Sequence, residues 1–441
     1  MTGIRELPAD SAVAVIGSGV AGLTAAYLLA QRHRVTLYEA DSRLGGHAHT
    51  HVIHGRGGVR TAVDTGFIVH NDRTYPTLLR LFDQLGVVTV DTDMSMSVSS
   101  QRTGLEYAGA LGLPGLFPTW RTLTRGRYLK MLVEIRRFHT LARRLLDDPA
   151  ADEPLDEFVV RSGLSTYFQE NFLLPLVAAV WSCDAGTAAR YPARYLFSFL
   201  DHHGMLTVFD SPQWRTVAGG SATYVAAVAD HVVGRGGTIR LDSPVTGLAE
   251  TGEGVEITAR SSRERFAAAV VATHPHQALS LLSAPSPAQT DVLGAIGYLA
   301  KPAVLHTDTS LLPAAPRARA SWNYQIRADG SQVAVTYDMT RLMRLRPETA
   351  AGPAPRYLVT MGRTDLVDPD AILAEMTYEH PVYDLQSVAA QRRLPEIETA
   401  AIAFAGAYHG WGFHEDGAAS GARAARVFGG TWPGETGAVS R

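Results

Sequence analysis

The sequence is poor in cysteine, since Cys183 is the only one among 441 residues. A single thiol excludes an intramolecular disulfide framework and any zinc or iron–sulfur site that needs several thiolate ligands. A reducing compartment such as the cytoplasm suits this composition. We expect Cys183 itself to be a small buried residue.

Long hydrophobic runs and a strong net charge are also missing. No stretch offers the roughly 18 consecutive apolar residues of a membrane-spanning helix, because even the run 172–181 is short and contains Pro175. The first residues lack the basic leader, apolar core and cleavage site of a secretory signal. The formal net charge of −3 disfavours nucleic acid as a partner. We therefore expect a cytoplasmic protein that does not span a membrane.

The N-terminal residues have the pattern of a strand, a glycine-rich turn, a helix and a second strand. The apolar residues 12–16 predict a short buried strand, which GSGVAG follows at 17–22. A helix to Ala30 and a strand over 35–38 complete the unit. This order predicts a doubly wound α/β domain that binds a dinucleotide.

Each conspicuous residue of this unit has a separate role in dinucleotide binding. Gly17 makes the tight turn, Gly19 lets backbone N–H groups reach the pyrophosphate, and Gly22 lets the helix lie against the strand. The helix N-terminus adds partial positive charge. Glu39, at the end of the second strand, is placed to accept hydrogen bonds from the adenosine ribose hydroxyls.

The rest of the chain predicts a second domain inserted into the first. At 441 residues the chain is too long for one core. The segment from Tyr75 to about residue 204 has mostly helical spacing, strands and helices return from Gly219, and the last helix is expected over 417–428. We expect a Rossmann-like dinucleotide domain over 1–75, 205–280 and 395–441, and a mixed helical and sheet substrate-binding domain over 76–204 and 281–394.

The residues that follow Glu39 resemble a known family. The segment ADSRLGGHAHT at 40–50 is similar to E-x-x-x-R-x-G-G-[RH] of the flavin-containing amine oxidases and their phytoene-desaturase-like relatives. The resemblance implies that Gly45 and Gly46 pass close to the pyrophosphate of FAD. It also implies that Arg43 lies near the phosphate and adenosine half. His47 stands where many relatives have arginine.

A second match is VDTGFIV at 63–69, which resembles the family segment that lines the flavin. The third is the run at 404–425, which resembles the closing strand, loop and helix of the family. The resemblance implies a glycine that ends the strand, an acid that reaches the ribityl chain, and small residues that open a helix facing the flavin. These roles fall in chain order on Gly406, on Glu415 or Asp416, and on Gly417 and Ala418.

The cofactor implied is noncovalent FAD, because family members with a covalent bond carry it on the C-terminal side, away from Cys183. Segments such as DTGFIVHNDRTYP and YHGWGFHEDG resemble a bacterial subgroup often associated with fatty-acid-modifying methyltransferases. The residues expected to contact FAD are Gly17, Gly19, Val20, Ala21, Gly22, Glu39, Ala40, Arg43, Gly45, Gly46, His47, Thr65, Gly66, Phe67, Val245, Thr273, Gly406, Glu415, Asp416, Gly417 and Ala418.

Four side chains are candidates for the chemistry. The resemblance implies that Lys301 holds a water near flavin N5, with a solvated strand-edge lysine as the alternative, and that Phe413 lies against the flavin, with core packing as the alternative. His409 and His414 flank the same loop and, if unperturbed, titrate near neutral pH, which would suit a proton relay. Spacing alone does not make the histidine pairs 202–203 and 274/276 ligands, so no metal is expected.

The stretch 120–146 is strongly basic, with eight cationic side chains against Glu134 alone. The apolar run LGLPGLF at 111–117 precedes it. Together they could form an amphipathic patch at the inner face of an anionic membrane, with 121–144 as the contact. The alternative is a solvated helix face compensated by acids such as Asp147 and Asp148.

The leading functional hypothesis is an FAD-dependent oxidoreductase that transfers a hydride from a small hydrophobic substrate to flavin N5. A lipid or fatty-acyl chain is the first choice of substrate, because no second wall of an amine cage can be identified. Amine oxidation is the alternative. A redox-neutral double-bond isomerase and a non-catalytic flavoprotein partner of a methyltransferase also stay open.

Overall fold

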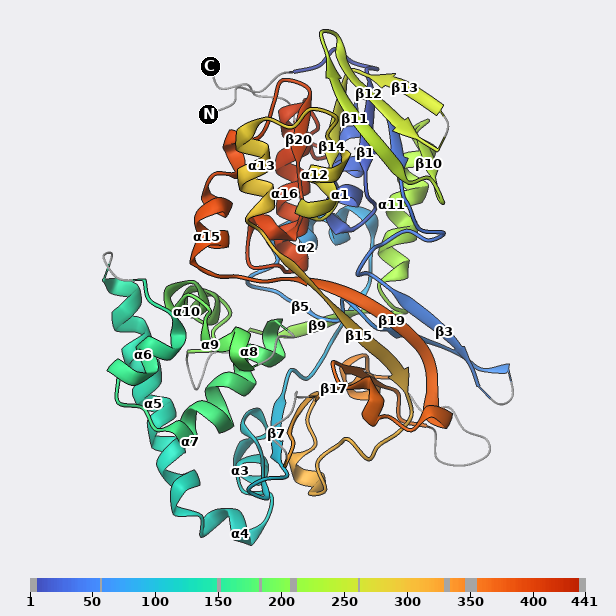
Figure 1. The fold of residues 1–441 in the computed structure, drawn as a ribbon. Coiled ribbons are helices and arrows are strands. Elements are labelled where there is room, and N and C mark those ends of the chain that lie inside the picture. The colour runs from blue at the N-terminus through green and yellow to red at the C-terminus, as the bar shows by residue number, and fades with distance from the viewer. Residues whose placement is uncertain are drawn as a thin grey trace.

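A computed structural model describes residues 6–55, 58–148, 152–181, 185–206, 212–260, 262–328, 334–345 and 355–435. Cys183 lies outside these residues, so its expected burial stays a prediction. The chain builds two large sheets, each packed against its own helices (Figure 1). The predicted combination of a Rossmann-like α/β unit with a mixed helical and sheet unit is confirmed.

The first sheet has five parallel strands drawn from the beginning, middle and end of the chain. Apolar β-branched runs form its centre, where β1 pairs with β2 and β14 so that Ala14 lies between Thr36 and Ala269. Parallel strands buried on both faces read as continuous apolar runs. In spatial order the strands are β10 (Thr238–Arg240), β2 (Arg34–Tyr38), β1 (Ala12–Ile16), β14 (Ala268–Val271) and β20 (Ile402–Phe404).

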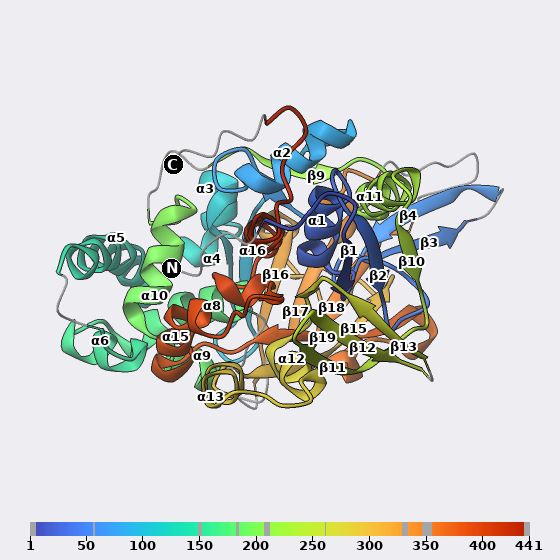
Figure 2. The same cartoon turned by 90° about the horizontal axis from the view of Figure 1, so that it is seen from above.

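The two faces of this sheet are covered by different layers (Figure 2). Val13 and Val15 of β1 face a helical layer, whereas Ala14 and Ile16 face a small antiparallel sheet. The helical layer consists of α1 (Val20–Leu29), α2 (Pro76–Leu85), α11 (Ala222–Gly234) and α16 (His414–Val427). The opposite layer consists of β11 (Val245–Thr251), β12 (Gly254–Ala259), β13 (Ser262–Phe266), α12 (Pro275–Leu281), α13 (Pro287–Gly294) and α15 (Leu385–Arg392).

The last helix, α16, begins at His414 and not at Gly417 as the sequence predicted. A capping hydrogen bond fixes its start, because the side chain of Asp416 accepts a hydrogen bond of 2.8 Å from the backbone N–H of Phe413. Gly417 instead packs on α1, since a Cβ there would lie 2.6 Å from Val20 Cγ1. The N-terminal and C-terminal helices thus lie in close contact.

The second sheet has seven strands, and two of them come from the segment that the sequence predicted to be mostly helical. β7 (Met96–Ser100) and β8 (Leu105–Ala108) extend it through a parallel pairing of β7 with β16 (Trp322–Ile326). The serine-rich run 95–100 has no helical apolar spacing, and pairing with β16 decides its conformation. The other strands are β19 (Ile372–Pro381), β15 (Tyr298–His306), β18 (Leu358–Met361) and β17 (Ala334–Asp338).

Helices beside this sheet form an aromatic core around Phe138, Phe158 and Phe197. None of the described helices is long and apolar enough to cross a lipid bilayer. The helices are α5 (Gly126–Asp147), α6 (Leu155–Arg161), α7 (Thr166–Phe168), a π-helical turn (Gln169–Leu173), α8 (Leu174–Trp181), α9 (Ala185–Ala189) and α10 (Ala193–His202).

Shorter elements connect the two sheets. One of them is the hairpin of β3 (Thr50–His54) and β4 (Arg60–Asp64). The domain boundaries proposed from the sequence stay a prediction. The remaining short elements include β5 (His70–Asn71), β6 (Thr89–Asp91), β9 (Trp214–Val217), α3 (Gly112–Leu116), α4 (Trp120–Leu123) and α14 (Met339–Leu342).

Candidate active site

A cavity of about 820 Å³ extends from the carboxyl edge of the five-stranded sheet to the seven-stranded sheet. The turn after β1 and the end of β2 line one end of it, and apolar side chains line the other. Ligands of doubly wound folds bind at this edge of the sheet, where loops follow the strands. The volume lies within the usual range for cofactor and ligand sites.

The glycines of the first turn differ in what surrounds them. Gly17 has a φ of +97°, and a Cβ there would lie 2.7 Å from the carbonyl oxygen of Ala272. A Cβ on Gly22 would lie 1.9 Å from the carbonyl oxygen of Gly17, so helix α1 needs a glycine there to pack against the turn. Gly19 differs, because no atom lies within 4 Å of a Cβ built on it. Open space therefore lies beside Gly19, at the N-terminus of α1.

Glu39 ends β2 and is held by its neighbours. One carboxylate oxygen accepts from the backbone N–H and hydroxyl of Ser18, and the other accepts from Asp41 N–H at 2.9 Å. The hydroxyl of Ser18 also accepts from Gly45 N–H at 3.2 Å, which ties two glycine-rich turns together. Sequence reasoning missed Ser18, although its place inside GSGVAG was a usable signal.

The second glycine-rich turn packs against the first. Gly46 has a φ of +57°, and a Cβ there would lie 3.1 Å from Gly19 Cα. Arg43 donates to the carbonyl oxygen of Gly46 at 2.9 Å, so its guanidinium holds the loop while it lines the cavity. His47 also lines the cavity, and burial and nearby histidines hold its pKa well below the usual value.

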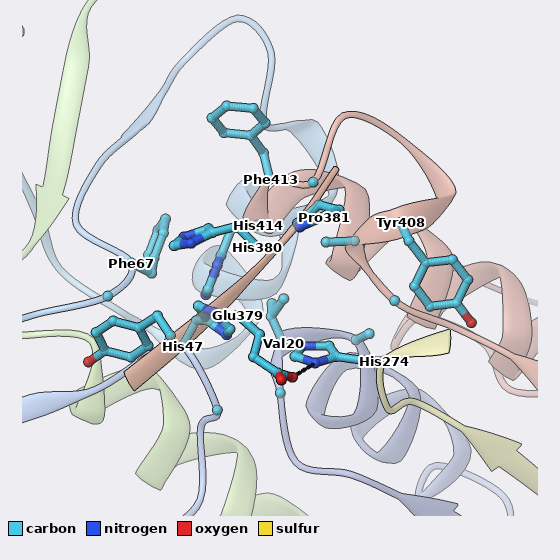
Figure 3. A pocket seen from close by; sticks show the side chains of 18 of the residues that line it. Val20, His47, Phe67, His274, Glu379, His380, Pro381, Tyr408, Phe413 and His414 are labelled. Atoms are coloured by element: carbon cyan, nitrogen blue, oxygen red, sulfur yellow. Dashed lines mark hydrogen bonds and ion pairs between the residues drawn. The ribbon is translucent and has the colours of Figure 1, made fainter. Parts of the chain in front are cut away.

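The centre of the cavity contains a hydrogen-bonded histidine and carboxylate (Figure 3). His274 Nδ1 lies 2.7 Å from Glu379 Oε2, and the imidazole stacks on Tyr298 with ring centroids 4.2 Å apart. Burial lowers the pKa of His274, while Glu379 opposes this effect. The ring of His380 lies 5.6 Å from that of His47, and burial lowers the pKa of His380 to about 4. The imidazoles of His274 and His380 are therefore neutral near pH 7.

Tyr378 adds a second polar group at the centre. Its hydroxyl lies 2.6 Å from the hydroxyl of Thr65 and 3.0 Å from His49 Nδ1. Tyr378, Glu379 and His380 belong to β19, and sequence reasoning missed all three. No local motif marks them, because only the crossing of this long strand beneath the five-stranded sheet brings them to the cavity.

Two of the four catalytic candidates line the cavity. His414 stacks on Phe67 with centroids 3.6 Å apart, and its Nε2 lies 2.9 Å from the hydroxyl of Tyr224. Burial lowers the pKa of His414 to about 3, so it does not titrate near neutral pH as the sequence analysis supposed. Phe413 stacks on Phe199 with centroids 4.8 Å apart.

The other two candidates lie outside the lining of the cavity. His409 packs beside Tyr408, and burial lowers its pKa to about 3, which argues against a relay at neutral pH. Lys301 is paired with Tyr378 between β15 and β19 and does not line the cavity, although its charge lowers the pKa of His380. The predicted direct roles of both residues stay predictions.

The acids of the last helix have structural partners. Glu415 accepts from the backbone N–H groups of Thr77 and Leu78, each at 2.9 Å, and thereby caps the N-terminus of α2. Asp416 caps its own helix. Because α16 begins at His414, both acids occupy its first turn and neither lines the cavity. The predicted contact of one of these acids with the ribityl chain stays a prediction, and the hydrogen bonds of both acids point to structural roles.

Most residues expected to contact FAD do line the cavity. The exceptions are Gly22 and Gly45, which shape turns, and the four residues from Glu415 to Ala418, which belong to the first turns of α16. Those in the lining are Gly17, Gly19, Val20, Ala21, Glu39, Ala40, Arg43, Gly46, His47, Thr65, Gly66, Phe67, Val245, Thr273 and Gly406.

The far end of the cavity is apolar and was not predicted residue by residue. Helical or strand periodicity predicts that such side chains are buried. It does not distinguish side chains that line a cavity from side chains in a packed core. The lining there includes Ile68, Val69, Met94, Ala179, Val180, Trp181, Phe199, Met205, Trp322, Tyr337 and Met361.

One group of possible metal ligands lies beside the cavity. Ligand atoms of His274, His276 and Glu379 lie within 4.8 Å of one another. The sequence spacing of the histidine pair 274/276 predicted no metal site. His276 is exposed, and its Nε2 lies 3.8 Å from Glu379.

Comparisons with known proteins agree with this architecture. The model of the flavin-containing amine oxidoreductase family matches residues 20–309. (S)-6-hydroxynicotine oxidase of Paenarthrobacter nicotinovorans is 25% identical over 264 residues, which is 59% of this chain and 59% of that protein. The match thus spans less than two thirds of that relative.

Solved structures share the fold at low sequence identity. Cyclohexylamine oxidase from Brevibacterium oxydans superimposes with a TM-score of 0.64 at 17% identity, covering 94% of this chain and 98% of that one. A fatty acid isomerase from P. acnes gives 0.64 at 15% identity, covering 93% and 97%. With the family match over most of the chain and the dinucleotide-type turn, we conclude that this protein belongs to the flavin-containing amine oxidoreductase family.

Proposed function

We propose that the chain binds FAD noncovalently and oxidises a hydrophobic substrate of the fatty-acyl or lipid type. Bound flavin supplies a hydride acceptor at its N5 atom. We infer the substrate class from the apolar side chains that line the end of the cavity at the seven-stranded sheet.

FAD fits the dinucleotide end. The open space beside Gly19 and the close approach of Gly46 form a backbone cradle at the N-terminus of α1, where a pyrophosphate is favoured. Glu39 already accepts three hydrogen bonds, and a carboxylate has about four acceptor sites. One site is left for a ribose hydroxyl. Noncovalent binding is proposed because Cys183 does not match the C-terminal position of covalent attachment in the family.

The apolar end of the cavity favours a hydrocarbon chain over a cation. Within the described lining, the acids are Glu39 and Asp41 at the dinucleotide end and Glu379 at the centre, where His274 is its partner. An ammonium group placed among Ala179, Val180 and Met361 would lose its hydration without gaining a counter-ion, which is costly. A hydrocarbon gains free energy by the same transfer.

The chain's own side chains suit removal of hydrogen from such a substrate. The apolar lining excludes water from the reacting carbon. His47 and His380 present neutral imidazoles to the centre, and His47 Nε2 and His380 Nδ1 have no hydrogen-bond partner in the described part of the chain. Each nitrogen can exchange a hydrogen bond with a polar group of the substrate, whereas the lowered pKa of each imidazole argues against holding a proton there at neutral pH.

Anaerobic titration of the purified protein tests the proposal. We expect a dioleoyl phospholipid dispersed in mild detergent to bleach the flavin absorption band, while benzylamine, cyclohexylamine and putrescine leave it unchanged. Val180→Asp, which places a carboxylate in the apolar end, should slow bleaching by lipid at least tenfold. Val233→Asp, on the exposed face of α11, is the matched control. Bleaching by amines alone would contradict the lipid assignment.

Amine oxidation is the second candidate. Aromatic rings of Trp181, Phe199 and Phe413 gather at the apolar end, and aromatic faces can bind a cation. The names of 6-hydroxynicotine oxidase and cyclohexylamine oxidase also favour it.

A lipid product of unchanged mass would instead support an isomerase, the activity named for one structural neighbour. A flavin that no substrate reduces would favour the non-catalytic partner of a methyltransferase.

A further inference from the structure

Exposed apolar side chains gather on α3, α4 and the first turns of α5, at the end of the molecule opposite β11–β13 (Figure 1). Packing in a core does not account for these apolar side chains, because a large fraction of each is exposed to solvent. The exposed fractions are 71% for Leu113, 71% for Trp120, 54% for Leu123, 39% for Leu129 and 69% for Val133. We call these five residues the α3–α5 surface.

Helix α5 shows that this exposure has a pattern. Tyr128, Met131 and Phe138 face the aromatic core and are fully buried. Leu129 and Val133 lie four residues apart on the opposite face, where i and i+4 side chains are neighbours. Arg136 follows one turn later on the same face and is also exposed. The outer face of α5 is thus amphipathic, with an apolar stripe beside cations.

The charges around this surface are positive and poorly compensated. Glu134 is the only acid within 120–146, and its buried carboxylate accepts from Ser165 N–H and Oγ at 3.1 and 2.6 Å. No carboxylate of the described residues pairs with Arg121 or Arg136. The guanidinium of Arg121 lies 5.7 Å from the ring centroid of Trp120. The formal net charge of the whole chain is −3, so the positive charge at this end contrasts with the rest of the molecule.

We propose that the α3–α5 surface docks the protein on an anionic phospholipid membrane. Tryptophan and exposed aliphatic side chains enter the boundary between headgroups and acyl chains, and arginine and lysine bind anionic headgroups. Charge favours this occupant over a second copy of the chain, since two copies would place like charges opposite each other.

The position of the surface also relates it to the cavity. Helix α5 packs against α10, which carries the cavity-lining Phe199. Helix α5 therefore runs from the docking surface to the helix that lines the apolar end of the cavity. This last step rests on the proposed lipid substrate, whereas docking itself rests on the surface alone.

Vesicle flotation with the full flavin-loaded chain tests the docking. We expect binding to vesicles of 70% phosphatidylcholine and 30% phosphatidylglycerol, weak binding to phosphatidylcholine alone, and loss of binding in high salt. Each cation removed should weaken binding about fivefold, so Arg121→Gln with Arg136→Gln should weaken it about 25-fold. Val133→Ser and Trp120→Ala should also weaken it. Flotation is measured without turnover, so it stays informative if lipid oxidation fails.

Matched controls lie on the other end of the molecule. Val233→Ser removes a valine that is 56% exposed on α11, and Arg263→Gln removes an exposed arginine of β13. Neither should change flotation. Equal binding to neutral and anionic vesicles, or equal losses in the controls and the test variants, would overturn the proposal. So would concentration-dependent dimers in solution that Val133→Ser abolishes, because the surface would then bind a second copy.

Discussion

His274 Nδ1 and Glu379 Oε2 lie 2.7 Å apart in the centre of the cavity. His274 follows β14 of the five-stranded sheet, and Glu379 belongs to β19 of the seven-stranded sheet. Their hydrogen bond therefore joins the two sheets where the cavity passes between them. Burial and the neighbouring carboxylate act on the pKa of His274 in opposite directions.

Glu379→Gln is expected to lower the pKa of His274 further, because the amide cannot compensate a charged imidazole as a carboxylate does. Glu379 is partly exposed, so we expect a loss of only about 1 kcal/mol in the free energy of unfolding. Histidine NMR titration and urea unfolding measure the two effects. Glu375→Gln, at an exposed position of the same strand, is the control. A higher pKa for His274 in Glu379→Gln would contradict this assignment.

Gly19→Ala separates cofactor binding from folding. Its φ of −62° suits alanine, and no atom lies within 4 Å of the new Cβ, so the free energy of unfolding without flavin should change by less than about 0.5 kcal/mol. The methyl group would occupy the space proposed for the pyrophosphate, and we expect flavin affinity to fall at least tenfold. Equilibrium dialysis against FAD measures this. Unchanged affinity would show that the phosphates do not pass Gly19.

Gly22→Ala is the contrasting variant. Its Cβ would lie 1.9 Å from the carbonyl oxygen of Gly17, so it should destabilise the fold even without flavin.

The dinucleotide end could be predicted from sequence because its information is local. Gly17, Gly19 and Glu39 lie within one strand–turn–helix–strand unit, and the pattern of apolar residues fixes where each falls. The centre could not be predicted in this way. Glu379 and His380 reach it through a strand crossing that no local pattern reports.

The C-terminal residues show a second limit. The family resemblance implied a role for Glu415 or Asp416 at the cofactor. In the structure α16 begins three residues earlier than the sequence predicted, and the carboxylate of Glu415 accepts hydrogen bonds from the first turn of α2. Helix ends are less reliably predicted than helices themselves, because capping hydrogen bonds such as that of Asp416 decide them.

Glu415→Ala should therefore act on stability more than on flavin binding. It would leave the N–H groups of Thr77 and Leu78 without their acceptor, at a cost of about 1–3 kcal/mol in the free energy of unfolding. Glu415→Gln keeps one acceptor oxygen and should lose less. Urea unfolding and dialysis against FAD provide the two measurements. A large loss of FAD affinity with unchanged stability would instead support a contact of Glu415 with the ribityl chain.

His70 provides a test of how burial sets the pH dependence of stability. Its side chain is fully buried among Phe67, Tyr75 and Phe82, and neither ring nitrogen has a hydrogen-bond partner in the described part of the chain. Burial lowers its pKa to about 4, whereas the unfolded chain binds a proton below about 6.5. The contribution of His70 to stability is thus fully present above pH 6.5 and is lost as the pH falls toward 4.

His70→Phe should remove this dependence, because phenylalanine fills the same aromatic pocket and takes up no proton. The loss in the wild-type protein is at most about 1.4 kcal/mol per pH unit for one histidine, so the stability of the wild type should rise relative to that of the variant on going from pH 4.5 to 7. Urea unfolding at half-unit steps measures the difference between them. Any cost of repacking shifts the variant's curve by a constant and leaves its slope unaffected. His54→Gln on exposed β3 is the control and should leave the slope as in the wild type. Parallel curves for His70→Phe and the wild type would show that His70 accepts its proton in the folded chain without penalty.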